Sequence, residues 1–293
     1  MFQDFLRHDE IGLTVSDAVP RRSGWSVLLP FFNERDCIAD TVASLAQQDE
    51  RPLVILIDNA STDGSAELAV AACRDHDVPY VLVHERRPGK VAALAAGLAC
   101  VTTPFVATCD ADTWYPAHYL ATAQTLLERP GVAAAGAFFV ARAAGTAQRV
   151  AAALHVNLIA RLLPSQCHAG GAGQVFRTAA LRGAGGFDPL RWNLVLEDHE
   201  IIHRVLKHGA MGYSTGLWCS PSPRKRDRAS VRWTLAERLC YIAAAAAQAG
   251  DWFFYNHLAG RLAARQLSSD RLRERRYQRA TAPAATFAPA VAA

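Results

Sequence analysis

The feature that most constrains the fold is an alternation of continuous apolar runs and helical patterns between residues 25 and 141. A continuous apolar run is typical of a strand buried on both faces, as in a parallel sheet covered by helices. Such runs occupy residues 25–30, 52–58, 80–84, 104–110 and 132–141. Helical patterns separate them at residues 38–46, 61–76, 89–101 and 116–128. This order predicts an α/β fold with a mainly parallel central sheet flanked by helices.

The whole chain divides into regions of different composition. We expect an N-terminal tail (residues 1–22), an α/β domain (23–222), a basic helical C-terminal extension (223–279) and a disordered tail (280–293). The first region is polar and irregular, and the extension is rich in arginine and alanine. Within the α/β domain, further helical patterns lie at residues 146–163 and 196–210.

Composition allows a large core and argues against several classes of protein. Hydrophobic residues make up 51% of the chain and charged residues 20%, an ordinary globular balance. The seven cysteines form no C-x-x-C pair, which argues against a disulfide framework or a zinc site and favours a reducing compartment. The N-terminus lacks the features of a signal peptide. The longest late apolar run, residues 239–247, is shorter than the ~20 residues that a membrane span needs. We therefore expect a cytoplasmic protein.

Polar side chains follow each of the first four predicted strands. In open parallel sheets, ligands bind in the crevice at the carboxyl ends of the strands. The residues at these ends are Asn33 and Glu34, Asp58 and Asn59, Arg86 and Lys90, and Asp110 and Asp112. We therefore expect these side chains to line one crevice.

The chain lacks two common glycine loops that hold phosphate. Residues 30–36 read PFFNERD where a dinucleotide-binding fold would carry G-x-G-x-x-G, and the pattern G-x-x-x-x-G-K-[ST] does not occur. A bound nucleotide diphosphate would need another source of positive charge, and a divalent cation held by carboxylates would supply it. Asp110 and Asp112 are candidates for these carboxylates, although aspartates also favour polar turns at strand ends.

Six short motifs resemble, in order and spacing, those of family 2 glycosyltransferases, which have a GT-A fold. They are VLLPFFNE (27–34), LIDNASTDGS (56–65), GKVAALAAGL (89–98), CDADTW (109–114), GGFD (185–188) and LEDHE (196–200). Each motif alone is weak evidence, but the ordered set is highly specific. The resemblance covers roughly residues 25–225. It implies an inverting, metal-dependent transfer of one sugar from a nucleotide-diphosphate sugar to a hydroxyl group of a glycan or lipid acceptor.

The resemblance implies donor-binding roles at the ends of the first three strands. Asp58 matches the acid that bonds the base or ribose, and Pro30 and Glu34 match the motif beside it. Lys90 opens a predicted helix, where the helix dipole also favours an anion, and it matches a lysine near the donor. The structural alternatives are a capping role for Asp58 and a solvated surface position for Lys90.

Asp110 and Asp112 match the metal-binding D-x-D motif of the family. The resemblance implies that Asp112 binds a divalent cation, Mn²⁺ or Mg²⁺, and that Asp110 binds the ribose or a water on the metal. In this role the cation offsets negative charge on the leaving nucleoside diphosphate.

Glu197 and Asp198 match the acid pair at the start of a family helix. The resemblance implies that Asp198 is the general base that deprotonates the acceptor hydroxyl, and that Glu197 orients it. The alternative is that both acids only stabilise a helix N-terminus. His199 and His203 have the i, i+4 spacing of a metal pair, but they lack a third ligand and we interpret them as structural.

A glycine-rich loop and a basic segment complete the resemblance. His168, Gly170 and Gly171 match the region beneath the acceptor and donor sugar, where glycine lets the backbone approach a ligand closely. The alternative for His168 is a core position. Arg232 lies in a basic segment that matches a loop closing over the diphosphate, although a solvated loop would look the same. Processive members carry Q/R-x-x-R-W, and Ala229 stands at the first position here, so we expect a non-processive enzyme.

Other functions are less consistent with these residues. A nucleotidyltransferase of related fold usually carries a basic glycine-rich loop after the first strand, which PFFNERD does not supply. A non-catalytic sugar-nucleotide-binding protein would not need the retained acids. Nucleic-acid binding has little support beyond the arginine-rich extension and a net charge of +4. Residues 250–279 mix aromatics with arginines, which suits contact with an anionic membrane surface, packing on the domain or an oligomer contact.

Overall fold

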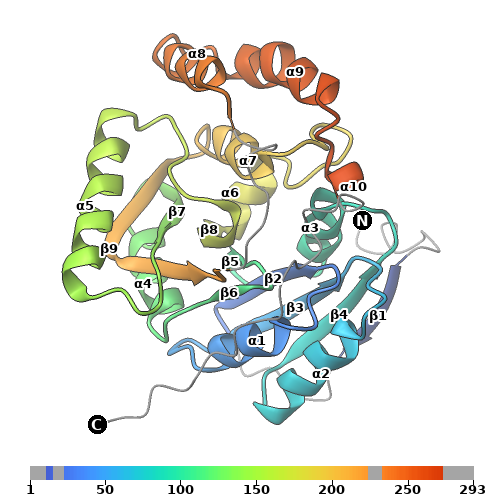
Figure 1. The fold of residues 1–293 in the computed structure, drawn as a ribbon. Helices are drawn as coiled ribbons and strands as arrows, with labels where there is room; N and C mark the ends of the chain where they lie inside the picture. The colour runs from blue at the N-terminus through green and yellow to red at the C-terminus, as the bar shows by residue number, and fades with distance from the viewer. Residues whose placement is uncertain (1–10, 16–22, 224–232, 273–293) are drawn as a thin grey trace.

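The structure is a computed structural model that describes residues 11–15, 23–223 and 233–272 (Figure 1). Its centre is a set of four parallel strands, which lie in the order β4 (Tyr80–Glu85), β3 (Leu53–Asp58), β2 (Trp25–Phe31) and β5 (Phe105–Thr108). The helices that follow these strands along the chain are α1 (Ile38–Ala46), α2 (Ser65–Asp75), α3 (Lys90–Ala99) and α4 (Tyr119–Leu127). All eight elements coincide with predicted ones, which confirms the α/β alternation.

Both faces of the central strands are buried, which explains their continuous apolar runs. Val27 and Leu29 of β2 lie in a core cluster that α1, α2 and α4 also line. Leu28 points to the opposite face and lies in a second cluster, lined by α3, α6 (Thr178–Gly183) and α7 (Glu197–Val205). Successive residues of a strand point to opposite faces, so apolar side chains are favoured along β2 on both sides. Ser26 is the polar exception, and its hydroxyl accepts a hydrogen bond from Thr103 (2.8 Å).

Beyond β5 the sheet is mixed. Strand β8 (Gln174–Arg177) pairs antiparallel with β5, and β7 (Val132–Phe139) pairs antiparallel with β8. Strand β9 (Ala210–Pro221) runs parallel to β7, and β6 (Thr113–Trp114) pairs antiparallel with the end of β9. The parallel character is therefore concentrated in the four central strands.

The predicted helix over residues 196–210 was too long, because α7 ends at Val205 and Ala210 begins β9. Strand β9 gave no apolar run in the sequence, since its first half is only partly buried and contains Gly212 and Gly216. Its fully buried part covers residues 217–220. Partial burial removed the signal on which the strand predictions depended.

The prediction of an irregular N-terminal tail was also wrong for residues 11–15. Strand β1 (Ile11–Val15) pairs antiparallel with β4 at the edge of the sheet. A five-residue edge strand between polar neighbours carries little signal of its own, because the pairing depends on the sheet it joins.

The C-terminal region is helical, as expected. It comprises α8 (Leu235–Ala246), a π-helix (Trp252–Leu258), α9 (Ala259–Ala264) and α10 (Ser269–Leu272). Aromatic residues of these helices, among them Tyr241, Phe253 and Phe254, form a third core cluster with Trp192. In Figure 1, α8 and α9 lie at the top of the view beyond α7. Across the described ranges, no helix has the length and apolar character needed to cross a bilayer.

Candidate active site

The sheet brings the predicted acids of β3 and β5 to one edge. Asp58 is the last residue of β3 and pairs in register with Phe31 at the end of β2. Asp110 follows the end of β5, where the amide of Cys109 still donates to the carbonyl of Leu28 in β2 (2.9 Å). Strand β2 lies between β3 and β5, so the two acids are separated by two strand spacings, roughly 10 Å. Asp58 and Asp110 therefore lie at the same edge of the sheet.

Asp58 is buried and has two partners. Its Oδ1 accepts a hydrogen bond from the amide of Ser61 (2.9 Å), and its Oδ2 lies 3.2 Å from Nδ1 of His84 in β4. The residue therefore closes a turn through Ser61. The alternative expected from the sequence, a cap on the following helix, is wrong, because α2 begins seven residues after Asp58, at Ser65, with Gly64 as its N-cap. The sequence did not indicate His84 as a site residue, because a histidine within an apolar strand is typical of a core position.

Asn59 positions the start of α3. Its Nδ2 donates to the carbonyls of Glu85 (2.9 Å) and Arg87 (2.7 Å), and its Oδ1 accepts from the amide of Gly89 (2.8 Å). Gly89 has a φ of 116°, in the region that favours glycine, and a Cβ there would lie 2.9 Å from Oγ of Ser269. These contacts place Lys90 at the first position of α3.

Lys90 joins three acids, and we call Lys90, Asp110, Glu197 and Asp198 the lysine–carboxylate cluster. The Lys90 Nζ donates to Oδ1 of Asp110 (2.7 Å) and lies 3.5 Å from Oε1 of Glu197. Burial alone would lower the pKa of Lys90, but the charges of Asp110 and Glu197 outweigh it and raise that pKa above its ordinary value. Lys90 is therefore a protonated cation inside the site and not a freely solvated surface residue.

Asp198 bridges two segments of the chain. Its Oδ2 accepts from the amide of Gly171 (2.9 Å), while its Oδ1 accepts from the amide of His199 and lies 2.9 Å from Nδ1 of the His199 ring. The His199 amide bond is local to the helix start. The bond to Gly171 spans 27 residues, so Asp198 does more than stabilise the N-terminus of α7.

The pKa values of the two adjacent acids are shifted in opposite directions. Burial raises the pKa of Asp198, but the charge and hydrogen bond of His199 and the charge of Lys90 outweigh burial and hold that pKa below its ordinary value. For Glu197, burial raises the pKa, the charge of Lys90 opposes this effect, and the charge of Asp198 adds to it, with a net rise. Acids with opposite pKa shifts are typical of an acid–base site.

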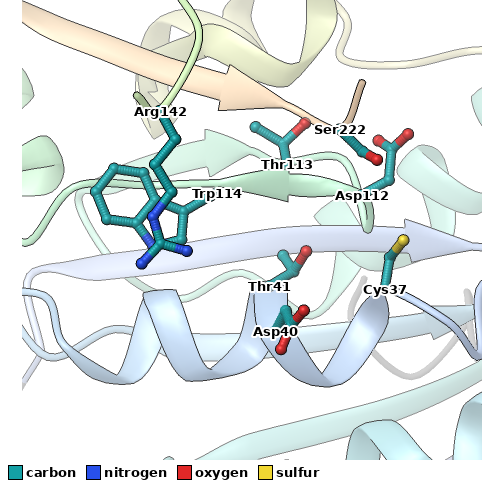
Figure 2. Close-up of a pocket in the computed structure, with 8 residues that line it drawn as sticks. All are labelled: Cys37, Asp40, Thr41, Asp112, Thr113, Trp114, Arg142 and Ser222. Atoms are coloured by element: carbon teal, nitrogen blue, oxygen red, sulfur yellow. The ribbon is translucent and has the colours of Figure 1, made fainter. Parts of the chain in front are cut away.

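Asp112 faces different neighbours from Asp110. The chain turns at Ala111 and Asp112, with the amide of Thr113 donating to the carbonyl of Asp110 (3.2 Å). Asp112 is 8% exposed and lines a pocket with residues of α1, β6 and two loops (Figure 2): Cys37, Asp40, Thr41, Thr113, Trp114, Arg142 and Ser222. In Figure 2 the Asp112 carboxylate lies beside Ser222, whose amide donates to the Asp112 carbonyl (2.7 Å). Asp110 therefore lies in the lysine–carboxylate cluster, whereas Asp112 lines this pocket.

The described residues contain no group of three histidine, cysteine, aspartate or glutamate side chains arranged to hold a metal ion. The D-x-D segment itself offers two carboxylates, Asp110 and Asp112, and a cation held by them would take further oxygen ligands from a substrate or water. This is the usual arrangement for Mg²⁺ in phosphate-transfer sites.

The glycine-rich loop separates into a part at the site and a part behind it. A Cβ on Gly171 would lie 3.3 Å from Nζ of Lys90 and 3.5 Å from Cβ of Asp198, so this residue lines the cluster. A Cβ on Gly170 would instead lie 2.7 Å from the ring of Phe139. The Nε2 of His168 lies 2.9 Å from the carbonyl of Leu163, and burial lowers the pKa of His168. His168 thus makes a contact expected of the structural alternative, and Gly170 lies against Phe139 and not against the cluster.

Tyr115 ties the D-x-D segment to this loop. Its hydroxyl accepts from the amide of Asp110 (3.0 Å) and donates to the carbonyl of Ala172 (2.9 Å). The Thr108 hydroxyl also donates to the carbonyl of Gly171 (2.7 Å). Both residues were missed, because each looks like an ordinary core position in the sequence.

The remaining predicted donor residues have mixed outcomes. Pro30 pairs in register with Ile57 one residue before Asp58, so it lies at the edge that carries the site. The Glu34 amide donates to Oγ of Ser65 (2.8 Å), which links the start of α2 to the turn before α1. Arg232 and the basic cluster at residues 224–228 lie outside the described residues.

The two histidines of α7 have separate environments. His199 lies against Asp198, with its ring edge-on to Trp233 (centroids 5.2 Å apart). The Nε2 of His203 lies 2.7 Å from Oδ1 of Asp251, and its ring stacks on Phe254. This geometry gives His203 the structural role that was expected. The position of His199 next to the predicted base was a signal that sequence reasoning did not use.

Residues 26–181 match the protein-family model described as glycosyl transferase family 2. The match covers more than half of the chain, so the chain belongs to this family. Among solved structures, a mannosyltransferase from Pyrobaculum calidifontis in complex with GDP-Man and Mn²⁺ aligns over 90% of this chain and 79% of its own, with a TM-score of 0.61 and 21% identity. This likeness supports the GT-A fold that the motifs implied.

Curated relatives resemble shorter parts of the chain. A poly-beta-1,6-N-acetyl-D-glucosamine synthase from Staphylococcus aureus is 35% identical over 96 residues, which are 32% of this chain and 23% of the relative. An undecaprenyl-phosphate 4-deoxy-4-formamido-L-arabinose transferase from Salmonella dublin is 32% identical over 105 residues, 34% of this chain and 32% of the relative. The chain thus aligns with a third or less of the length of these two relatives.

Proposed function

We propose that the protein is an inverting glycosyltransferase that moves one sugar from a nucleotide-diphosphate sugar to a hydroxyl group of a glycan or lipid acceptor. The observation that carries this proposal is the position of Asp198, a carboxylate with a lowered pKa held between Gly171 and His199 beside Lys90. Membership of glycosyl transferase family 2 supports it. The similarity to the arabinose transferase from Salmonella dublin and to the mannosyltransferase from Pyrobaculum calidifontis also supports it.

In the proposed reaction, Asp198 accepts the proton of the acceptor hydroxyl while the acceptor oxygen bonds to the anomeric carbon. The bond from that carbon to the diphosphate oxygen breaks, and the nucleoside diphosphate leaves with the electron pair. One displacement of this kind inverts the anomeric configuration. The lowered pKa keeps Asp198 ionised at neutral pH, so it is ready to take the proton as the new bond makes the hydroxyl more acidic.

Lys90 and the D-x-D segment are proposed to stabilise the leaving group. The raised pKa of Lys90 keeps its ammonium charged. A charged donor forms stronger hydrogen bonds to phosphate oxygens than a neutral donor does. Asp112 is proposed to hold a divalent cation, because a carboxylate supplies the hard oxygen ligand that Mn²⁺ and Mg²⁺ prefer. When bound, this cation offsets the charge of the diphosphate as a Lewis acid. We propose that Asp58, with His84, binds the nucleoside at the neighbouring strand end.

A donor-hydrolysis screen over nucleotide sugars, with Mn²⁺, Mg²⁺ or a chelator, tests the reaction class. We expect release of a nucleoside diphosphate from one donor and loss of this release with the chelator. Activity that survives chelation contradicts the metal assignment. Release of pyrophosphate when a nucleoside triphosphate and a sugar 1-phosphate are supplied together would indicate a nucleotidyltransferase. Donor binding without turnover on any acceptor would indicate a non-catalytic binding protein.

Asp198→Asn tests the base. We expect donor binding to persist while transfer falls by about 10²- to 10⁴-fold, the usual contribution of a general base. Donor affinity is measured by calorimetry and transfer by product formation. The matched control is Asp49→Asn, the same chemical change at an exposed position outside the site, which should keep full activity. Turnover by Asp198→Asn at the rate of this control would refute the assignment.

A further inference from the structure

Helix α5 (Thr146–Leu162) carries a line of exposed apolar side chains. Leu154, Leu158 and Leu162 are 59%, 58% and 70% exposed, and they recur every four residues, so they lie near one another on the helix surface. The inner side of α5 packs through Ala153 into a small cluster with Phe138 and Trp218. Leucines on the outer side are therefore not needed to attach the helix to the sheet, and their exposure is unfavourable in water.

Helix α8 repeats this pattern next to the end of α5. Leu235, Leu239 and Ile242 are 74%, 58% and 41% exposed, at spacings of four and three residues. The turn after α5 is bonded to α8, because Gln166 and Cys167 donate to the carbonyl and the hydroxyl of Tyr241 (3.2 and 3.3 Å). We call the six exposed residues of the two helices, Leu154, Leu158, Leu162, Leu235, Leu239 and Ile242, the α5–α8 surface.

The exposed charged side chains of α5 and α8 have one sign. Helix α5 contains Arg149 and Arg161 and no aspartate or glutamate. Arg161 of α5 and Arg238 of α8 are exposed beside the leucines. The acid of α8, Glu237, is buried and paired with Arg261 (3.1 Å) and Arg265 (3.3 Å), so it does not reach this surface. The exposed side of both helices therefore combines large apolar side chains with arginine.

We propose that the α5–α8 surface docks on an anionic lipid bilayer. Leucines beside arginines on a helix are typical of helices that lie in the membrane interface, with the apolar side chains among the acyl chains and the arginines at lipid phosphates. A second copy of the chain fits this surface less well, because a two-fold contact would bring Arg161 and Arg238 against the same arginines of the partner. The proposal concerns binding and does not rest on the proposed transfer reaction.

This surface differs from the one expected from the sequence. Residues 250–279 were candidates for membrane contact from the sequence, and Arg261 and Arg265 of this region pair with Glu237. The exposed leucines of α5 and α8 form a separate candidate surface. Residues 163–170 connect the end of α5 to Gly171, which lines the lysine–carboxylate cluster.

Sedimentation with vesicles tests the proposal on the full chain. Vesicles of phosphatidylcholine alone are compared with vesicles that contain an equal amount of phosphatidylglycerol. We expect binding to the anionic vesicles only, weaker at high salt, and about tenfold weaker for Leu154→Gln/Leu158→Gln, because these side chains no longer enter the interface. Arg161→Glu should also weaken binding. The control is Leu190→Gln, at a leucine that is 98% exposed and lies on neither helix, and it should bind like the unmodified chain.

Equal binding of the double variant and the unmodified chain would overturn the proposal, as would the absence of binding to anionic vesicles. Light scattering distinguishes self-association. A dimer that Leu154→Gln/Leu158→Gln converts to a monomer, without vesicle binding by the unmodified chain, would assign this surface to a second copy instead. All substituted positions are exposed, so thermal unfolding should stay unchanged, and donor hydrolysis without vesicles should also stay unchanged. If the unmodified chain shows no donor hydrolysis, this result counts against the proposed function and not against docking.

Discussion

At the start of α7, the pKa values of two adjacent carboxyl groups shift in opposite directions because their neighbours differ. Asp198 faces the His199 ring and the Gly171 amide, whereas Glu197 is partly buried beside Lys90 and next to the negative charge of Asp198. The same residue pair on an exposed helix would have ordinary pKa values. The chemistry proposed for Asp198 therefore depends on His199, which we regard as a positioning residue.

The substitution His199→Ala should raise the pKa of Asp198. It removes the charge and the hydrogen bond that lower this pKa, while the burial that raises it remains. A general base must be ionised, so activity is lost as the pH falls through its pKa, and the acidic limb of kcat/KM should move to higher pH in the variant. The measurement is the pH profile of transfer.

His199→Asn provides the comparison, because asparagine can donate a hydrogen bond but carries no charge. We expect its acidic limb to lie between those of the unmodified chain and His199→Ala. An equal loss of activity at every pH, without movement of the limb, would reduce His199 to a packing role.

At the scale of elements, a buried ion pair joins α7 to the turn at residues 183–189. Arg204 forms two hydrogen bonds with Glu200 (2.7 and 2.8 Å) and donates to the carbonyls of Ala184 and Gly186. The hydroxyl of Tyr255 in the π-helix donates to the same Glu200 (2.6 Å). This network connects the helix that bears Asp198 to both neighbouring segments.

Arg204→Met should destabilise the protein by about 3–5 kcal/mol, because it leaves the Glu200 carboxylate buried without its partner. Urea denaturation measures the free energy of unfolding. The exposed pair Arg51–Asp77 offers a control, since Arg51→Met should cost less than about 1 kcal/mol. The double variant Glu200→Gln/Arg204→Met should recover part of the loss. Similar losses for Arg204→Met and Arg51→Met would mean that the buried pair does not hold α7.

At the scale of the whole molecule, the C-terminal helices support the site and are not an independent appendage. Phe253 is fully buried, and its ring stacks on Tyr241 (5.0 Å) and Trp233 (5.9 Å). Both of these rings also contact His199. The third core cluster therefore reaches, through one layer of aromatic rings, the histidine that faces Asp198.

Phe253→Ala should lower the free energy of unfolding by about 3–5 kcal/mol through loss of buried area and creation of a cavity. The aromatic layer should also loosen, so transfer activity should decrease even at temperatures below the melting transition. Trp252→Ala, at the neighbouring residue of the same helix, is the control, since that side chain is 51% exposed and its loss should matter much less. A stable Phe253→Ala variant would show that this cluster contributes little.

The local pattern of the sequence was enough to predict much of the fold. The central strands and their helices were found because each strand needs apolar side chains on both faces and each helix needs them on one. Where burial is partial, as in β9, or where a strand depends on a partner, as in β1, this signal is absent. The site was predicted in part for the same reason, since Asp58 and Asp110 follow strands whose ends must meet.

By itself, the sequence determined the order of elements, the edge of the sheet that carries the acids and the family resemblance of its motifs. The tertiary structure decided which groups touch. It turned Asp112 away from Lys90, placed Gly171 and His199 on Asp198, and left the leucines of α5 exposed. The physical reason is that periodicity and turn chemistry act within a few residues. The contacts of Lys90 and Asp198 join segments 20 or more residues apart, and the packing of the whole chain sets those contacts.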